Sequence, residues 1–94
     1  MFFAYLLASN PSGTLYIGST SDLVRRVSEH KVKAVPGFAA NYGVDRLVWF
    51  ERHQTLETAM QREKRVKSWK RAWKIELIEQ DNPHWVDLYS NILR

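Results

Sequence analysis

Two short apolar runs separated by turn-forming residues open the chain. Residues 2–8 are apolar and aromatic, as expected of a buried strand, and residues 14–18 follow with a second strand pattern. Between them lies Ser9-Asn10-Pro11-Ser12-Gly13, a dense cluster of turn formers. Residues 2–18 are therefore predicted to form a β-hairpin.

The pattern then changes to helical spacing. The polar residues 19–22 supply helix-capping side chains just before a periodic segment that runs to about residue 34. Four residues recur there at helical intervals: Leu23, Val27, His30 and Ala34. Pro36 and Gly37 end this predicted helix. Residues 37–44 are expected to form an irregular loop, and residues 46–52 are rich in strand formers and predict a third strand.

The second half of the chain is mostly helical in pattern. Thr55 is a plausible N-cap for a helix over residues 56–68, and the helical pattern resumes over residues 70–80 after a bend. Five apolar residues near the end suggest a short amphipathic C-terminal helix: Trp85, Leu88, Tyr89, Ile92 and Leu93. The order ββαβαα plus this helix predicts a small α/β (α+β) sandwich, in which helices flank a three-stranded, mostly antiparallel sheet.

Composition bounds the class of protein. The 94 residues suffice for one domain, 1–94, and 45% hydrophobic with 26% charged residues is typical of a folded soluble chain. The sequence contains no cysteine, which excludes a disulfide scaffold and a cysteine-ligated zinc site and fits a reducing compartment. The longest apolar run, residues 1–8, is too short to span a bilayer and lacks the flanks of a signal peptide. We therefore expect a cytoplasmic protein without membrane association.

Positive charge is concentrated in one segment. The net charge is +4, yet residues 62–74 alone hold seven Lys and Arg against one acid, while seven bases face nine acids elsewhere. The seven are Arg62, Lys64, Arg65, Lys67, Lys70, Arg71 and Lys74. Trp69 and Trp73 lie among them, and bases interleaved with aromatics are expected of a protein that binds a phosphate backbone. The alternative is a solvated helix face.

Polar residues also occupy positions where the helical pattern calls for apolar ones. In the helix over residues 56–68, one stripe is defined by Leu56, Ala59, Met60 and Val66, and Glu63 lies within it. A carboxylate facing the body of a domain needs a partner, so Glu63 is either in an internal salt bridge to an arginine or a metal ligand. His30 similarly falls on the apolar side of the first helix, with Arg26 one turn away. His30 is either a hydrogen-bonded core residue or part of a site.

The hairpin adds a pair of tyrosines. If Ser9 and Thr14 close the turn, Tyr5, Tyr16 and Gly18 share one face of the sheet, whereas another register would separate the tyrosines. Glycine inside a strand suggests close approach of backbone or ligand. Plain packing would also account for two tyrosines on paired strands.

These residues resemble the signature of the GIY-YIG nuclease superfamily. Tyr16-Ile17-Gly18, with Tyr5 eleven positions earlier, is similar to its two namesake elements, although the first is here Phe3-Ala4-Tyr5. The match continues through Leu23-Val24-Arg25-Arg26, His30, Glu63, Asn82-Pro83-His84-Trp85 and Asp87-Leu88. It covers essentially the whole chain and is most similar to the small stand-alone bacterial proteins of the superfamily, whose domain resembles the amino-terminal nuclease domain of the repair subunit UvrC.

The resemblance implies a DNA endonuclease that uses Mg²⁺ or Mn²⁺, with a role in repair or recombination. The implied catalytic residues are Tyr5, Tyr16, Arg26, His30 and Glu63, and Glu63 is also the implied metal ligand. The candidate nucleic-acid-binding residues are Arg25, Lys64, Lys67, Lys70, Arg71, Lys74 and Asn82. The expected partners are DNA and a targeting protein. The alternatives are a nucleic-acid-binding module without useful turnover and a purely structural domain.

Overall fold

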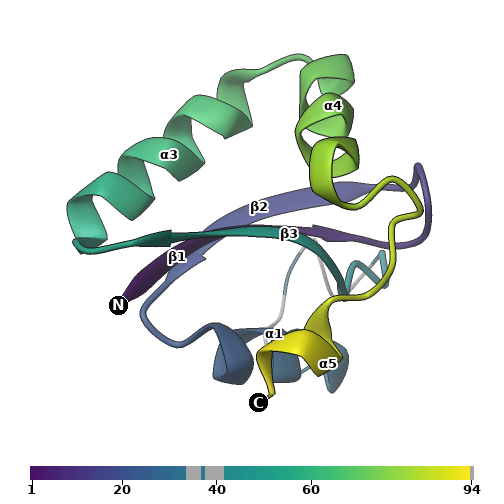
Figure 1. Cartoon of the computed structure of the whole chain (residues 1–94). Helices are drawn as coiled ribbons and strands as arrows, with labels where there is room; N and C mark the ends of the chain where they lie inside the picture. The colour runs from purple at the N-terminus through teal and green to yellow at the C-terminus, as the bar shows by residue number, and fades with distance from the viewer. Residues whose placement is uncertain (34–36, 38–41, 94) are drawn as a thin grey trace.

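A three-stranded antiparallel sheet lies between two layers of helices (Figure 1). The computed structural model describes residues 1–33, 37 and 42–93. The strands are β1 (Phe2–Ala8), β2 (Leu15–Thr20) and β3 (Arg46–His53), in the order β2-β1-β3. The helices are α1 (Leu23–Lys31), α3 (Leu56–Ser68), α4 (Arg71–Asp81) and α5 (Tyr89–Ile92). Helices α3 and α4 cover one face of the sheet and α1 and α5 the other, which confirms the predicted fold class and element order. No helix in the described part of the chain is long and apolar enough to cross a membrane.

The β1–β2 turn sets the register on which the tyrosine hypothesis depends. The Ser9 amide donates to the Thr14 carbonyl at 3.0 Å, and the Thr14 amide donates to the Ser9 hydroxyl at 3.0 Å. Tyr5 therefore pairs with Gly18, and Leu7 with Tyr16. Because side chains alternate along a strand, Tyr5, Tyr16 and Gly18 share the face that α1 covers, as predicted.

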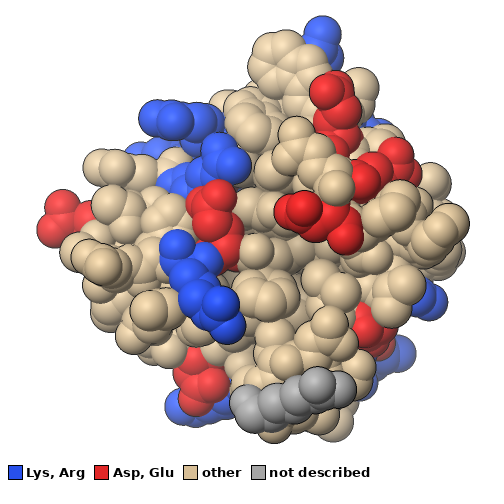
Figure 2. Space-filling view, viewed as in Figure 1, with Lys and Arg blue, Asp and Glu red and all other residues tan. Residues whose placement is uncertain are grey.

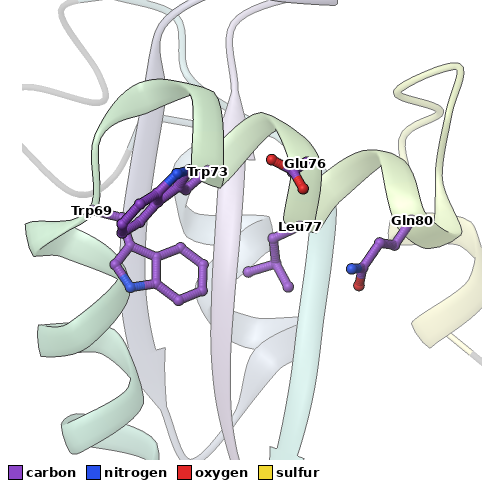
Figure 3. Close-up of a pocket in the computed structure, with 5 residues that line it drawn as sticks. All are labelled: Trp69, Trp73, Glu76, Leu77 and Gln80. Atoms are coloured by element: carbon purple, nitrogen blue, oxygen red, sulfur yellow. The ribbon is translucent and has the colours of Figure 1, made fainter.

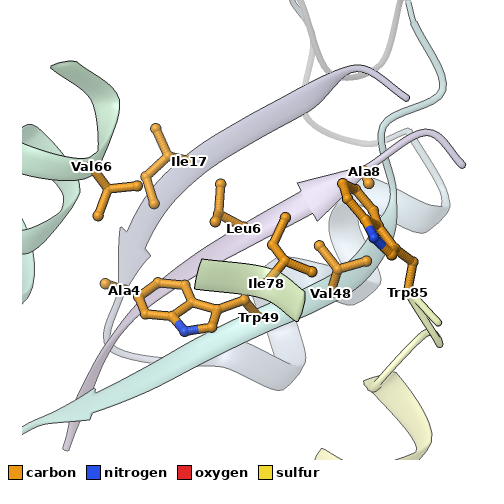
Figure 4. Close-up of a cluster of buried hydrophobic side chains, with 9 residues drawn as sticks. All are labelled: Ala4, Leu6, Ala8, Ile17, Val48, Trp49, Val66, Ile78 and Trp85. Carbon is orange, nitrogen blue, oxygen red and sulfur yellow. The ribbon is translucent and has the colours of Figure 1, made fainter. Parts of the chain in front are cut away.

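The central strand β1 is buried on both faces, which accounts for its lack of charged residues. Its alternate residues Ala4, Leu6 and Ala8 pack toward α3 and α4, where they meet Val66 and Ile78 (Figure 4). The residues between them belong to the second cluster, on the α1 side: Tyr5 and Leu7, with Leu23, Val27, Val44 and Leu47. A single strand thus supplies both layers of the core.

The helix ends follow local sequence signals. Asp22 caps α1 by accepting a hydrogen bond from the Arg25 amide at 3.1 Å, and α1 ends at Lys31, earlier than predicted. Ala34 lies outside the described residues, as does most of the predicted loop. Helices α3 and α4 are separated by Trp69 and Lys70, whose ψ angles of 150° and 156° are extended, so the predicted bend is confirmed.

The predicted apolar stripe of α3 is wrong in part. Ala59 and Val66 are buried, but Leu56 is 45% and Met60 53% exposed. The helix is rotated toward Arg62, whose guanidinium stacks 5.8 Å from the Trp49 ring and 5.4 Å from the Trp69 ring. The contacts of Arg62 with the two tryptophan rings take the place of the apolar contacts expected of Leu56 and Met60. Glu63 consequently lies at the edge of the buried face of α3 and is half-buried.

The C-terminal segment is anchored by Asp87. One carboxylate oxygen accepts hydrogen bonds from the Leu47 amide at 3.2 Å and the Tyr89 amide at 3.0 Å. The other accepts from the Lys31 ammonium at 2.5 Å. Lys31 also donates to the Asp45 carbonyl at 3.1 Å. One carboxylate thereby connects α1, β3 and the start of α5.

Replacing Asp87 with asparagine is expected to lower the free energy of unfolding by about 2 kcal/mol at neutral pH. Burial raises the pKa of Asp87, but the hydrogen bonds from Lys31 and Tyr89 lower it more, so it ends below its ordinary 3.8. A depressed carboxyl pKa stabilises the fold above the unfolded value and loses that effect as pH falls through the folded value. The difference between wild type and variant in urea unfolding should therefore shrink from pH 7 to pH 3. Asp81→Asn is the exposed control, and a difference independent of pH would contradict the assignment.

Candidate active site

Tyr5 and Tyr16 lie side by side on the α1 face, with ring centroids 6.4 Å apart. The Tyr5 ring crosses over Gly18, because a Cβ built on Gly18 would lie 2.5 Å from Tyr5 Oη and 2.6 Å from its Cζ. The sequence suggested close approach of backbone or ligand at Gly18, and the structure places the Tyr5 ring there. Gly18 lets the Tyr5 ring pass across β2, which is an edge strand of the sheet.

Tyr5 is a hydrogen-bond donor at neutral pH. Burial raises its pKa well above the ordinary 10.0, the neighbouring Tyr16 raises it further, and Arg26 opposes both. Glu63 and Glu29 also raise the pKa of this phenol, so both carboxylates lie within electrostatic range of it. A phenol with a raised pKa keeps its proton and cannot serve as the base.

His30 has the opposite character. Its side chain is only 4% exposed and its ring centroid lies 5.4 Å from that of Tyr16. Burial lowers its pKa and the positive charge of Arg26 lowers it further, so the ring is neutral at physiological pH. Neither ring nitrogen has a hydrogen-bond partner among the described residues. The interpretation of His30 as a hydrogen-bonded core residue therefore finds no support, and a neutral imidazole can accept a proton beside Tyr16.

Two arginines border the site on the α1 side. Glu29 bridges them, with Oε2 at 3.3 Å from Arg25 Nε and Oε1 at 3.5 Å from Arg26 Nε. These residues line a polar cavity of about 160 Å³ together with Thr20, Ser21 and Asp22. Sequence reasoning missed Glu29, although its spacing of three and four residues from the arginines is the signal of helical ion pairs. Glu29 fixes the direction of the Arg26 guanidinium.

Glu63 approaches the same edge strand from the opposite face. Ser19 follows Gly18, so its side chain points toward α3, and its hydroxyl donates to Glu63 Oε1 at 2.6 Å. No lysine or arginine of the described residues forms an ion pair with Glu63, so the internal salt bridge is not found there. Strand β2 therefore has the tyrosine pair, Tyr5 from β1 and its own Tyr16, on one face and the Glu63 carboxylate of α3 on the other.

The donor set at Glu63 fits a hard, hydrated cation. Among the described residues there is no group of three or more His, Asp or Glu that could hold a metal ion, which argues against a protein cage. Mg²⁺ keeps most of its waters and needs only one or two carboxylates. Glu63 supplies one half-buried carboxylate, and Ser19 orients it through one oxygen only.

Two predicted nucleic-acid-binding residues share a cavity with Glu63. Lys64 and Lys67 line this cavity of about 270 Å³, together with Met60 and Gln61. In Figure 2, basic side chains gather over α3, whereas acidic ones gather over α4. The lysines beside Glu63 therefore place positive charge along the wall of this cavity.

The basic residues at the start of α4 have other neighbours. Lys70 Nζ lies 4.9 Å from the Trp73 ring centroid, and Arg71 donates to the Ser12 and Gly13 carbonyls at 2.7 and 2.6 Å. Lys74 is half-buried. The adjacent cavity of about 300 Å³ shares no described residue with that of Glu63 and is lined by Trp69, Trp73, Glu76, Leu77 and Gln80 (Figure 3). Arg71 thus holds the β1–β2 turn by hydrogen bonds and does not belong to the cluster of residues around β2.

Asn82 does not lie on the nucleic-acid surface, contrary to its assignment from the sequence. Its side chain is buried. Its amide nitrogen donates to the carbonyls of Val48 and Val86 at 3.1 and 2.9 Å, and its oxygen accepts from the Val86 amide at 2.9 Å. These bonds hold the turn after α4 against β3. Asn82 is therefore a structural residue.

Comparison with known proteins points to one family. The family model described as the GIY-YIG catalytic domain matches residues 1–76. The UPF0213 protein of Natronomonas pharaonis is 35% identical over 79 residues, which are 84% of this chain and 92% of that protein. The solution NMR structure of the UPF0213 protein of Bacillus halodurans matches with a TM-score of 0.54 and 29% identity, over 87% of each chain. The sheet and helices described above are thus shared with a solved relative.

Proposed function

Because the chain belongs to the GIY-YIG catalytic domain family, we propose that it is a divalent-metal-dependent endonuclease that hydrolyses phosphodiester bonds in DNA. The observation that supports this most is the gathering of five side chains around β2: Tyr5, Tyr16, Arg26, His30 and Glu63. A role in repair or recombination and a partner protein for targeting extend the same proposal.

Each of these groups suits one requirement of phosphodiester hydrolysis. The reaction needs an activated water, neutralisation of the phosphorane and a stabilised leaving oxygen. Tyr16 orients the water and passes a proton toward the neutral His30, while Tyr5 keeps its proton and donates a hydrogen bond. Arg26 neutralises the nonbridging oxygens. Glu63 would hold Mg²⁺ or Mn²⁺, which supplies Lewis-acid stabilisation of the leaving oxygen.

A gel cleavage assay tests the proposal. Purified protein is incubated with Mg²⁺ or Mn²⁺ and a panel of duplex, single-stranded and branched DNA, beside Glu63→Ala and a reaction in EDTA. Cleavage that disappears in both controls is expected. Cleavage that survives both would show a contaminating nuclease and contradict the proposal.

A nucleic-acid-binding module without turnover is the second candidate. The observation that favours it is the pairing of Glu29 with both Arg25 and Arg26, which engages Nε of the one arginine, Arg26, that catalysis needs. Salt-sensitive binding without cleavage of any substrate in the panel would select this candidate.

The double substitution Lys67→Ala with Lys70→Ala is expected to weaken DNA binding and to flatten its salt dependence. Each lost phosphate contact should reduce the slope of log K against log[salt] by about 0.9, so two contacts give about 1.8. Fluorescence anisotropy between 50 and 300 mM salt measures the slope. The exposed Lys33→Ala is the control. An unchanged slope in the double variant would show that DNA does not pass over this end of α3.

A further inference from the structure

A second cavity adjoins the arginine cavity on the α1 face of the sheet. It measures about 210 Å³ and shares Ser21 and Asp22 with the cavity that Arg25 and Arg26 line. Its other walls come from β1, β3, α5 and the first residues of α1. The residues used below are Phe3, Ser21, Asp22, Phe50, Arg52 and Asn91. Nothing in the proposed mechanism uses this cavity.

We propose that this cavity binds one unpaired nucleobase of the strand that is cut, next to the phosphate that Arg26 contacts. The inference rests on the proposed nuclease function and narrows its substrate class. The preferred substrate is DNA whose nucleotide beside the scissile bond is unpaired, as in a single-stranded tail or a mismatch.

The apolar part of the cavity suits a base. The rings of Phe3 and Phe50 lie edge to face, with centroids 6.4 Å apart and planes at 66°. Both residues are half-buried, so part of each ring remains open to a ligand. Contact between a base and an aromatic ring contributes about 1–3 kcal/mol and tolerates any base, because every base has a π-face.

The polar part supplies donors and acceptors of the kind that base edges require. The Arg52 guanidinium lies 6.0 Å from the Phe50 ring centroid, so a cationic donor lies beside the phenylalanine rings. The side-chain nitrogen of Asn91 makes no hydrogen bond among the described residues. Asp22 uses one oxygen to cap α1, and its carboxylate can accept from an exocyclic amine.

Charge and size restrict the occupant to a single nucleotide unit. Arg25 and Arg26 line one of the two cavities that share Ser21 and Asp22, and Arg52 lines the other, so each cavity offers positive charge to a phosphate that flanks the base. Cavities for drug-sized ligands measure roughly 300–1,000 Å³. A cavity of about 210 Å³ lies below that range and is of a size for one base. Extruding a base from a duplex costs a few kcal/mol, and least where it is already unpaired.

Solution NMR in EDTA tests the cavity without any cleavage. A single-stranded tetranucleotide is titrated into the protein, and a duplex of the same sequence is titrated separately. Shifts of the Phe3 and Phe50 ring protons and the Asn91 amide, with contacts from base protons to these rings, are expected for the single strand only. Shifts confined to Arg25 and Arg26, or to Trp69 and Trp73, would overturn the inference, as would equal shifts with the duplex.

A variant separates this inference from the proposed function. Arg52→Ala with Asn91→Ala changes two exposed side chains, and Lys33→Ala, outside the basic segment, is the surface control. The double variant should bind the single strand about tenfold more weakly than wild type does. An abasic nucleotide at the position that enters the cavity should lower the affinity of wild type by the same factor. It should not lower the affinity of the double variant any further. If the abasic nucleotide weakens binding by the same factor in wild type and in the double variant, the cavity does not bind the base. Base contacts in EDTA without cleavage in Mg²⁺ would leave the inference standing and remove the nuclease.

Discussion

Replacing Glu63 with glutamine is expected to lower the rate of DNA cleavage by about 10³-fold, which is about 4 kcal/mol of transition-state stabilisation. Glutamine keeps the size of the side chain and can still accept the hydrogen bond from Ser19. It removes the negative charge that a divalent cation requires. DNA binding should be unchanged or tighter, because a carboxylate no longer repels the phosphates.

Glu57→Gln is the matched control, since Glu57 lies in the exposed first turn of the same helix. Its cleavage rate should stay within about twofold of wild type, although loss of a favourable charge at the helix N-terminus costs about 0.5 kcal/mol of stability. Circular dichroism melting of both variants distinguishes chemistry from folding. If Glu63→Gln cleaves at the wild-type rate, Glu63 is not the metal ligand. If it unfolds, the carboxylate is structural.

Replacing Gly18 with alanine is the second change with a large expected effect. The added Cβ would lie within 3.0 Å of three atoms of the buried Tyr5 side chain, so the ring must shift. Overpacking of this kind costs about 1–3 kcal/mol. Cleavage should fall at least tenfold as well, because the Tyr5 hydroxyl leaves the position that it holds next to Tyr16.

A double-mutant cycle with Tyr5→Leu tests this contact. Leucine lacks the ring atoms that meet the new Cβ, so Gly18→Ala should cost at least about 1 kcal/mol less in that background. The free energies of unfolding of the four proteins come from urea titrations. Additive costs would show that Gly18 is required for a reason other than the passage of the Tyr5 ring.

The sequence was sufficient to predict the architecture because the signals that set it are local. The turn formers between Ser9 and Thr14 determine the hairpin register, which in turn places Tyr5 and Tyr16 on one face. The element order and the break near Trp69 follow from capping residues and periodicity. The structure brings the five predicted catalytic side chains together around β2, and their roles remain predictions.

What the sequence could not predict depends on contacts between distant segments. The rotation of α3 follows from Arg62 stacking on Trp49, which lies thirteen positions earlier in β3. The link from Ser19 to Glu63 joins residues 44 positions apart. Asn82 was assigned to nucleic-acid binding only through its resemblance to a family asparagine, and its burial depends on contacts with Val48 and Val86 that the sequence does not reveal.

The position of Glu63 at the edge of the buried face of α3 has a consequence for local unfolding. Tyr5, Tyr16, Arg26 and His30 all belong to the first 31 residues, whereas Glu63 comes from a helix that buries only Ala59 and Val66. Regions with few buried apolar contacts open at free energies below that of global unfolding. An opening of α3 would withdraw the proposed metal ligand while the hairpin and α1 stay folded, so cleavage should be lost in mild denaturant before the sheet unfolds.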